Sequence, residues 1–418
     1  MAGGGAISAV MIHDHDIAIA GGGLNGPLLA LALARAGLSV ALVDARPAPA
    51  RAEAGFDGRA YALAAASVRM LGALGLWPGL APRAQPILGV RTAQGLVGQG
   101  ALGPGMGFAE GDLAEGPMGW MVEDRNLYAA LVAATLAEPG ITRHDGVAVV
   151  AQSVEATGIR VGLGDGRALT ARLLVGADGR DSGVAARAGI RRQGWDYGQT
   201  ALVCALAAEQ PHEGVAHQIF LPGGPLAILP LPGDRVSIVW SEARERAEGL
   251  ARLPDPQFLA ALAPLVAPVC GDVRLDGVRF AYPLRLSLAE AWVAPRLALV
   301  GDAAHGVHPI AGQGLNLGLR DVAALAEVLI QAQRRGEDIA APDVLARYQT
   351  WRRPETVALA LGMDTINRLF SNDNPVLRLA RGLGMAAVDA CPPLRRAAVR
   401  QAAGLTAAAP RLLQGLPV

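Results

Sequence analysis

A glycine-rich turn close to the N-terminus constrains the fold of this chain more than any other feature. The apolar segment 15–20 is expected to form a buried strand, and it leads into Gly21, Gly23 and Gly26, which keep a GxGxxG spacing. Residues 24–36 are apolar and are expected to form a helix. A strand, a tight glycine turn and a helix in this order begin a βαβ unit. The sequence therefore predicts an α/β fold with a Rossmann-like parallel sheet.

The same turn can hold the pyrophosphate of a dinucleotide. Its glycines allow close approach of the backbone, and the start of the helix supplies free N–H groups and a partial positive charge. Residues 39–43 are expected to form a second strand that ends at Asp44, whose carboxylate is placed to bind an adenosine ribose. A lone GxGxxG is weak evidence in a chain with 53 glycines, but the strand and the terminal acid strengthen it. These features do not distinguish FAD from NAD.

A second glycine-rich segment near residue 300 makes that distinction. The apolar strand 297–300 ends at Gly301-Asp302. The run Gly312-Gln313-Gly314-Leu315-Asn316 is expected to open a helix of roughly fifteen residues. A helix start there can place N–H groups at the N1/C2=O edge of a flavin, which becomes anionic when the flavin is reduced. The segment therefore favours FAD.

A metal site is the competing interpretation of this segment. Asp302, His305 and His308 are all residue types that bind metals. Their spacing would bring them to one face only on a helix, and Pro309 and the glycines argue against a helix here. We therefore expect no metal site.

The pattern of strands and turns divides the chain. Segments between 198 and 283 alternate apolar and polar residues between Pro/Gly turns, which is typical of an antiparallel sheet. Strand 297–300 then returns to the first domain, so the sheet domain is inserted into it. The expected parts are a flexible extension at 1–13, an FAD-binding domain at 14–85, 119–190 and 284–370, a β-sheet substrate domain at 86–118 and 191–283, and a C-terminal helical tail at 371–418.

Composition excludes several classes of function. The chain is 52% hydrophobic, and its 37 basic and 37 acidic residues balance, so neither disorder nor nucleic-acid binding is expected. All the basic residues are Arg, which excludes a Schiff-base or P-loop lysine. Three widely spaced cysteines suit a reducing compartment. The first ten residues lack the features of a signal peptide, and the longest apolar run, 258–270, is too short to span a bilayer.

A third element completes a resemblance to a known family. Asp178-Gly179 follows the expected strand 168–175 and by itself would be an ordinary turn. Together with the GxGxxG and Gly301-Asp302 motifs, it resembles the class A flavoprotein aromatic hydroxylases, which have the para-hydroxybenzoate hydroxylase fold. Further segments are similar to the ubiquinone-biosynthesis branch of that family, and the resemblance covers about residues 14–405. These segments are 56–63, 122–127, 282–284, 308–318 and 369–375.

The resemblance implies roles for individual residues. Asp302 would contact the ribityl hydroxyls, Arg125 would reach the FAD phosphates or the ribityl region, and Arg59 would lie near the flavin and the reductant. A guanidinium pairs well with phosphate, although either arginine alone would be read as a surface ion pair. Pro309 and Asn316 are expected near the flavin, and no side chain is assigned as a catalyst. The expected cofactor-binding residues are Gly21, Gly23, Gly26, Asp44, Arg59, Arg125, Asp178, Gly301, Asp302, Gly312, Gly314, Leu315 and Asn316.

The resemblance also implies a reaction. NAD(P)H, bound only transiently because there is no second GxGxxG, would reduce FAD, and a flavin C4a-hydroperoxide formed with O2 would hydroxylate a polyprenylated phenol. His217 is a weak candidate for a base, and a solvent-facing strand histidine is the plainer interpretation. The alternatives are hydroxylation of another aromatic substrate, a halogenase or epoxidase on the same fold, and a non-hydroxylating flavin protein of a biosynthetic complex. A halogenase is disfavoured because the chain has no lysine.

The C-terminal stretch 374–416 has two interpretations. It combines leucine and alanine with six arginines and a single acid, Asp389, which suits a helix on a membrane surface. A helix that covers the core and turns a basic face to water fits the same pattern. A lipid-tailed substrate favours the membrane, so we expect a cytoplasmic protein at the inner face of the membrane, with other quinone-biosynthesis proteins as partners.

Overall fold

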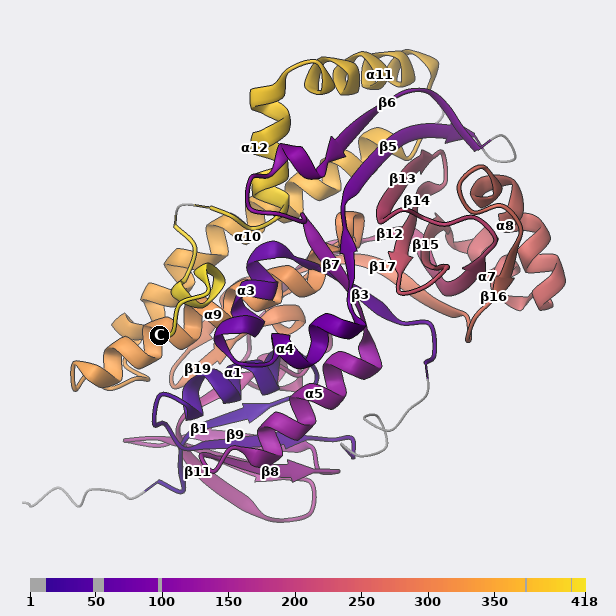
Figure 1. The fold of residues 1–418 in the computed structure, drawn as a ribbon. Coiled ribbons are helices and arrows are strands. Elements are labelled where there is room, and N and C mark those ends of the chain that lie inside the picture. The colour runs from indigo at the N-terminus through magenta and orange to yellow at the C-terminus, as the bar shows by residue number, and fades with distance from the viewer. Residues whose placement is uncertain (1–12, 48–55, 97–99, 373, 407) are drawn as a thin grey trace, which may run out of the picture.

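Two sheets dominate the computed structural model, which describes residues 13–418 except 48–55, 97–99, 373 and 407. All but the last residue of the expected N-terminal extension lies outside the described residues. The first sheet lies beside α1, α5 and α9, and the second carries α7 and α8 at the opposite end of the molecule (Figure 1). The mixed α/β class predicted from the sequence is confirmed.

The first sheet contains the predicted βαβ unit. Its strand order is β18-β19-β11-β1-β2-β8, and the four pairings from β19 to β8 are parallel. An antiparallel extension, β9 and β10, continues from β11. The strands are β1 (His15–Ala20), β2 (Val40–Asp44), β8 (Ile141–Asp145), β9 (Val149–Val154), β10 (Ile159–Leu163), β11 (Ala168–Gly176), β18 (Val293–Ala294) and β19 (Leu297–Leu299).

The helices that pack against the first sheet carry apolar residues on their buried faces. Every residue of α1 from Gly26 to Ala34 is buried, because the helix packs against the first sheet and against both α5 and α9. The helix α9 is longer than expected, since its buried face continues to Ala332 before the chain turns at Gly336. The helices are α1 (Asn25–Ala34), α3 (Ala65–Ala73), α4 (Trp77–Leu80), α5 (Asp124–Ala137), α6 (Gly183–Arg187), α9 (Gln313–Arg334) and α10 (Pro342–Phe370).

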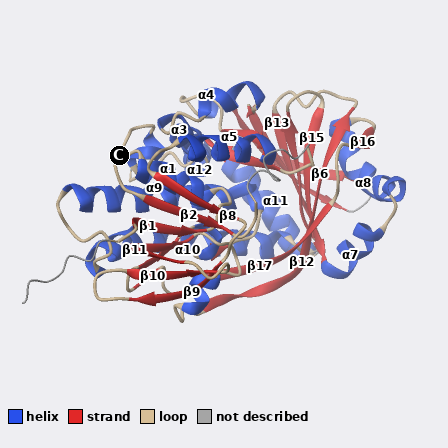
Figure 2. Ribbon diagram, turned by 90° about the horizontal axis from the view of Figure 1, so that it is seen from below, coloured by secondary structure: helices blue, strands red, loops and turns tan. Residues whose placement is uncertain are grey.

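The second sheet is mainly antiparallel, as the sequence predicts. Its order is β20-β17-β12-β15-β14-β13-β5-β6, with β16 beside β12, and only the described pair β13–β5 runs parallel. Figure 2 shows β12 and β17 running from this sheet toward the first. The strands are β5 (Gly89–Leu96), β6 (Gly100–Ala109), β12 (Arg192–Ala208), β13 (Val215–Leu221), β14 (Gly224–Leu231), β15 (Arg235–Ala243), β16 (Val273–Leu275), β17 (Phe280–Ala289) and β20 (His305–Gly306).

The boundary expected at residue 283 differs from the observed sheet. Strand β17 runs on to Ala289, and β20, which follows Gly301-Asp302, pairs with it. Apolar residues alternate along β17 to this end, so the strand has no reason to stop earlier. The loop of the second glycine-rich motif therefore lies where the two sheets meet.

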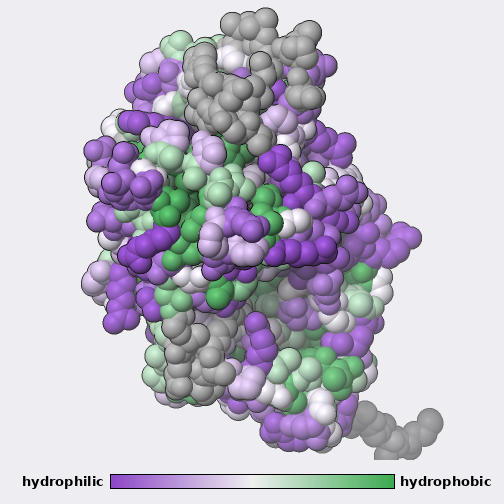
Figure 3. Space-filling view, turned by 90° about the vertical axis from the view of Figure 1, so that its right-hand side faces the viewer, coloured by the Kyte–Doolittle hydropathy of each residue, from purple (hydrophilic) through white to green (hydrophobic). Residues whose placement is uncertain are grey.

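One face of the second sheet is covered by α7 (Arg244–Arg252) and α8 (Asp255–Cys270). Helix α8 contains the longest apolar run of the sequence, residues 258–270. Its inner side packs Phe258, Leu262 and Val266 against Cys204 and other residues of the sheet. Its outer side is mostly Ala and Pro, and Figure 3 shows an apolar area among hydrophilic side chains on this end of the molecule. No helix in the part of the chain that the structure describes is long and apolar enough to cross a membrane.

A small sheet and the C-terminal helices complete the fold. The small sheet has the order β3 (Ala60–Ala64), β7 (Gly119–Glu123), β4 (Gln85–Ile87). Helices α11 (Pro375–Asp389) and α12 (Pro392–Ala402) follow α10, and α11 lies along β6 (Figure 1). Arg395 and Arg400 of α12 form ion pairs with Asp112 and Glu115. Part of the basic charge of the tail therefore attaches it to the protein.

Candidate cofactor and active site

The three motifs found in the sequence meet at one edge of the first sheet. They follow the neighbouring parallel strands β1, β11 and β19, whose carboxyl ends share that edge. Gly21 has a φ of 115°, and a Cβ there would lie 2.2 Å from the carbonyl oxygen of Ala177. A Cβ at Gly26 would lie 1.9 Å from the carbonyl oxygen of Gly21. The turn can therefore close against the Asp178-Gly179 segment only with glycine at both positions.

The end of β2 supplies an acceptor suited to a ribose. Asp44 is buried, and its Oδ1 accepts a hydrogen bond of 2.8 Å from the backbone N–H of Arg46. Its Oδ2 is buried and has no hydrogen-bond partner among the described residues. A buried carboxylate oxygen without a donor is costly, and ribose hydroxyls are donors of the right kind. The glycine turn and this carboxylate fit the adenosine and pyrophosphate parts of a dinucleotide.

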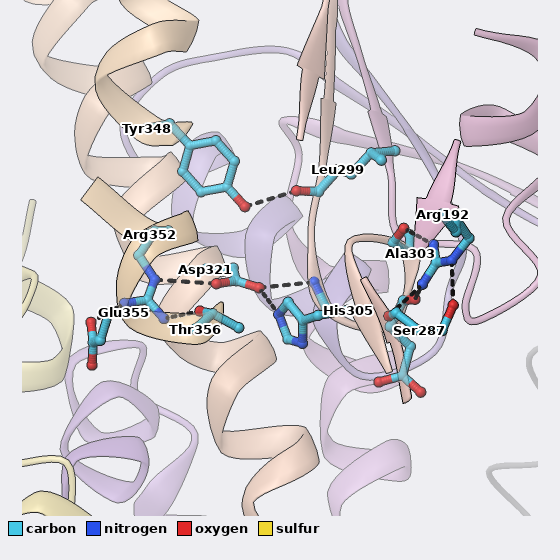
Figure 4. A network of polar contacts seen from close by, with 12 residues as sticks. Arg192, Ser287, Leu299, Ala303, His305, Asp321, Tyr348, Arg352, Glu355 and Thr356 are labelled. Carbon is cyan, nitrogen blue, oxygen red and sulfur yellow. Dashed lines mark hydrogen bonds and ion pairs between the residues drawn. The ribbon is translucent and has the colours of Figure 1, made fainter. Parts of the chain in front are cut away.

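Side chains from three elements fix the loop that carries Asp302 (Figure 4). The hydroxyl of Tyr348 donates to the carbonyl of Leu299 over 2.7 Å, and the N–H of Gly301 donates to Asp321 over 3.1 Å. From β12, the guanidinium of Arg192 donates to the carbonyls of Asp302 and Ala303. These hydrogen bonds fix the loop at its start, middle and end.

Asp321 is the centre of this arrangement. It lies on α9 with no exposed surface, and its Oδ2 is bonded to His305 Nε2 as well as to the N–H of Gly301. Its Oδ1 accepts from Arg352 Nε over 3.1 Å, and Arg352 is also buried. Figure 4 shows His305 and Arg352 on opposite sides of this carboxylate. The two buried charges compensate each other, and together they connect α9 and α10 to the loop.

The side chain of Asp302 is available to a ligand. Its carboxylate is 40% exposed and pairs with Arg180 Nε over 3.1 Å. Arg180 directly follows the third motif, so this ion pair joins the segments that carry two of the motifs. Sequence reasoning assigned no role to Arg180 or Arg192. Arg180 could have been found because it directly follows Asp178-Gly179, whereas nothing in the sequence near Arg192 points to the loop.

The start of α9 is pinned to the small sheet by Asn316. Its Nδ2 donates to the carbonyls of Ala62 and Gly312, and its Oδ1 accepts from Ala64 N and Ser67 Oγ. All four of its hydrogen-bonding positions are therefore used within the protein. Gly312 precedes the helix with a φ of 61°. The expected flavin contacts at Pro309, Gly314, Leu315 and Asn316 stay predictions, and for Asn316 the structure adds this internal role.

Two other predicted residues have protein partners. Both carboxylate oxygens of Asp178 accept bonds at the start of α6, from Ser182 Oγ and Val184 N. Arg59 pairs with Asp57 and Asp124 and lies over the ring of Phe280. Asp178 is near the glycine turn, because the peptide group between Ala177 and Asp178 contacts Gly21. Arg59 lies beside the first residue of β17 in the second sheet.

Arg125 lies beside an open cavity and shows no described contact with the glycine turn. It pairs with Glu123 over 2.8 Å and stacks over Phe56, which Arg235 of the second sheet also covers. The cavity has a volume of about 510 Å³. It is lined by Pro82, Arg83, Glu123, Arg125, Asn126, Ala129, Pro232 and Arg235. The phosphate contact expected for Arg125 stays a prediction.

The histidines near the second motif point to different partners. His305 bonds to Asp321, and His308 Nε2 lies 3.4 Å from Gln199 Oε1. In the part of the chain that is described, no group of three His, Cys, Asp or Glu residues could hold a metal. His217 is half-buried rather than solvent-facing, because it shares a sheet face with Ile228 on the side that α8 covers. Burial lowers the pKa of His217.

A pH dependence of stability is expected from His308. Burial lowers the pKa of His308 to about 4, below the value of 6.5 for a free histidine. The unfolded chain therefore binds this proton more readily than the native protein between those values. The contribution of His308 to the free energy of unfolding should be fully present above pH 6.5, and it should be lost as the pH drops toward 4. Urea unfolding of wild type and His308→Gln at several pH values measures this. If the free energy of unfolding changes equally with pH in both proteins, the prediction is contradicted.

Comparison with known proteins agrees with the site. A sequence model described as the FAD binding domain matches residues 14–360. The chain is 45% identical over 406 residues to the ubiquinone hydroxylase UbiL of Rhodospirillum rubrum, covering 96% of this chain and 93% of the relative. It is 37% identical over 403 residues to 3-demethoxyubiquinol 3-hydroxylase of Escherichia coli, covering 93% and 98%.

The fold is also that of a solved structure. The p-nitrophenol 4-monooxygenase PnpA of Pseudomonas putida superposes with a TM-score of 0.79 at 20% identity, covering 94% of this chain and 98% of that one. This likeness concerns the fold. Since the family match spans most of the chain and includes all three motifs, the protein belongs to the FAD-binding domain family.

Proposed function

We propose that this protein is an NAD(P)H- and O2-dependent FAD monooxygenase that hydroxylates the ring of a polyprenylated phenol in ubiquinone biosynthesis. The observation that carries the proposal is the meeting of the three motifs at one sheet edge, with Asp44 and Asp302 as acceptors for the sugar parts of FAD. Two relatives similar over nearly their whole length are named hydroxylases of ubiquinone or demethoxyubiquinol.

The cofactor supplies the redox and oxygen chemistry. The protein's residues bind FAD, orient the substrate beside it and enclose both. The turn at Gly21 and the N-terminus of α1 hold the pyrophosphate, and the N-terminus of α9 stabilises negative charge on the flavin. Asp302, kept in place by Arg180 and Arg192, holds the ribityl chain. No side chain is required as a nucleophile. NAD(P)H binds only transiently.

The second sheet offers an apolar wall for the aromatic substrate. Residues alternate across a strand, so Val203 and Ala205 of β12 face away from α8, as do Leu229 and Val239 of the paired strands. Ala205 packs in a separate cluster with Met121 of the small sheet. This apolar face would bound the ring on the side away from α8 and exclude water from it.

Purified protein is expected to be yellow, because the paired motifs hold FAD without a covalent bond. Acid precipitation should release the flavin. A prenylated phenol should stimulate NAD(P)H oxidation and give a hydroxylated product, detected by mass spectrometry. Folded but colourless protein that does not take up added FAD would contradict the proposal. Flavin binding without hydroxylation of any phenol would favour the alternative, a non-hydroxylating member of a biosynthetic complex.

The proposal includes a location in the cytoplasm, at the inner face of the membrane that contains the substrate's prenyl tail. The apolar and basic composition of 374–416 supports this. The ion pairs of Arg395 and Arg400 leave less of its charge for lipid headgroups than the sequence suggested. Flotation with anionic and with neutral vesicles tests the location, and absence of binding to both would contradict it.

A further inference from the structure

Asn25 lies between the two cofactor-binding motifs. It is the first residue of α1, directly after the glycine turn, and has only part of its surface exposed. Its amide group reaches across to the Asp302 loop and to α9. The Oδ1 of this amide is buried and has no hydrogen-bond partner among the described residues. A buried acceptor without a donor is unfavourable unless a ligand supplies one.

Two glycines make room for this amide. A Cβ at Gly301 would lie 2.1 Å from Asn25 Nδ2. A Cβ at Gly318 would lie 2.5 Å from Nδ2 and 2.8 Å from Oδ1. Gly301 also has a φ of 61°, so it would be glycine in any case. Gly318 sits in the regular helix α9, where no backbone strain requires glycine, so the space taken by Asn25 is the reason for it.

We infer that Asn25 is a positioning residue for the bound dinucleotide. Its amide sets the spacing between the pyrophosphate turn and the Asp302 loop, and its Oδ1 accepts a hydrogen bond from a ribityl hydroxyl. Ribityl hydroxyls are donors, and Asp302 beside this amide is the acceptor proposed for the same chain. The inference rests on FAD binding, which the proposed function also requires.

Two substitutions of Asn25 separate a cofactor role from a structural one. Asn25→Ala should weaken FAD binding about five- to tenfold, the loss of one hydrogen bond. Asn25→Asp keeps the shape but adds negative charge beside the pyrophosphate. It should weaken FAD binding further, with partial recovery in salt, because the charge repels the pyrophosphate. Asn25→Ala removes the unpaired acceptor, so its apoprotein should lose no stability although its FAD affinity falls. A purely structural residue would change affinity and apoprotein stability in the same direction.

A double mutant tests the space argument. Gly318→Ala should weaken FAD binding in the wild-type background, because the new methyl group displaces the Asn25 amide. Combined with Asn25→Ala, it should weaken FAD binding no further and should raise the apoprotein Tm by about 1–2 °C, since Ala favours a helix over Gly. The readouts are the FAD dissociation constant, from flavin fluorescence quenching, and the apoprotein melting temperature.

The outcomes decide between this inference and the proposed function. Unchanged FAD affinity in both Asn25 variants overturns the inference, as does an equal loss from Gly318→Ala with and without Asn25. Wild-type protein that fails to bind FAD would instead contradict the proposed function.

Discussion

Asp321→Ala is expected to lower the free energy of unfolding of the apoprotein by about 3–5 kcal/mol, because it removes the fully buried carboxylate partner of Arg352 and leaves that buried guanidinium only the partly exposed Glu355. The substitution also removes the acceptor for the N–H of Gly301 and the partner of His305. Both losses affect the loop that carries Asp302. A cofactor-binding defect should therefore accompany the loss of stability.

Urea unfolding of the apoprotein measures the effect, with Tyr348→Phe as the matched control. Tyr348 fixes the same loop through one hydrogen bond to Leu299, and its ring contacts remain in the variant. Losing that bond should cost about 1–3 kcal/mol, since the carbonyl stays buried. If Asp321→Ala is no more destabilising than this control, the Asp321–Arg352 pair does not hold the loop.

The sequence predicted the parts of the fold that depend on local pattern. The strand expected at 15–20 is confirmed as β1 at those bounds, and the strand expected at 39–43 is confirmed as β2, one residue later. Glycine spacing and apolar periodicity act over a few residues, so they can be read without knowledge of distant contacts.

The support of the site could not be predicted in the same way. Arg192, Asp321 and Arg352 lie far apart in the chain and meet only when α9, α10 and β12 pack around one loop. Charged residues on helices are usually exposed, so a pattern reading places Asp321 and Arg352 in water. The role inferred for Asn25 depends on Gly301 and Gly318, which are distant in the chain. Asn25 occupies a variable position of GxGxxG, so the motif itself does not indicate that role.

Asp302→Ala is expected to weaken FAD binding about ten- to a hundredfold, through loss of charge-assisted hydrogen bonds worth roughly 1.5–3 kcal/mol. Apoprotein stability should change little, because the carboxylate is 40% exposed and its partner Arg180 is similarly exposed. His305→Ala should have the opposite pattern, with a larger effect on apoprotein stability than on FAD affinity. His305 is fully buried against Asp321, so its removal should destabilise the apoprotein and affect FAD binding less.

Asp181→Ala is the matched control for Asp302→Ala. Asp181 lies two residues after the third motif and is 87% exposed, and its only described ion pair is with Arg285. Its removal changes the net charge equally without touching the loop, so FAD affinity should stay within about twofold of wild type. Flavin titration of the apoproteins compares the three variants. If Asp181→Ala weakens FAD binding as much as Asp302→Ala, general charge explains the effect. If a chelator abolishes activity while Asp302→Ala retains FAD, the rejected metal site becomes the better interpretation.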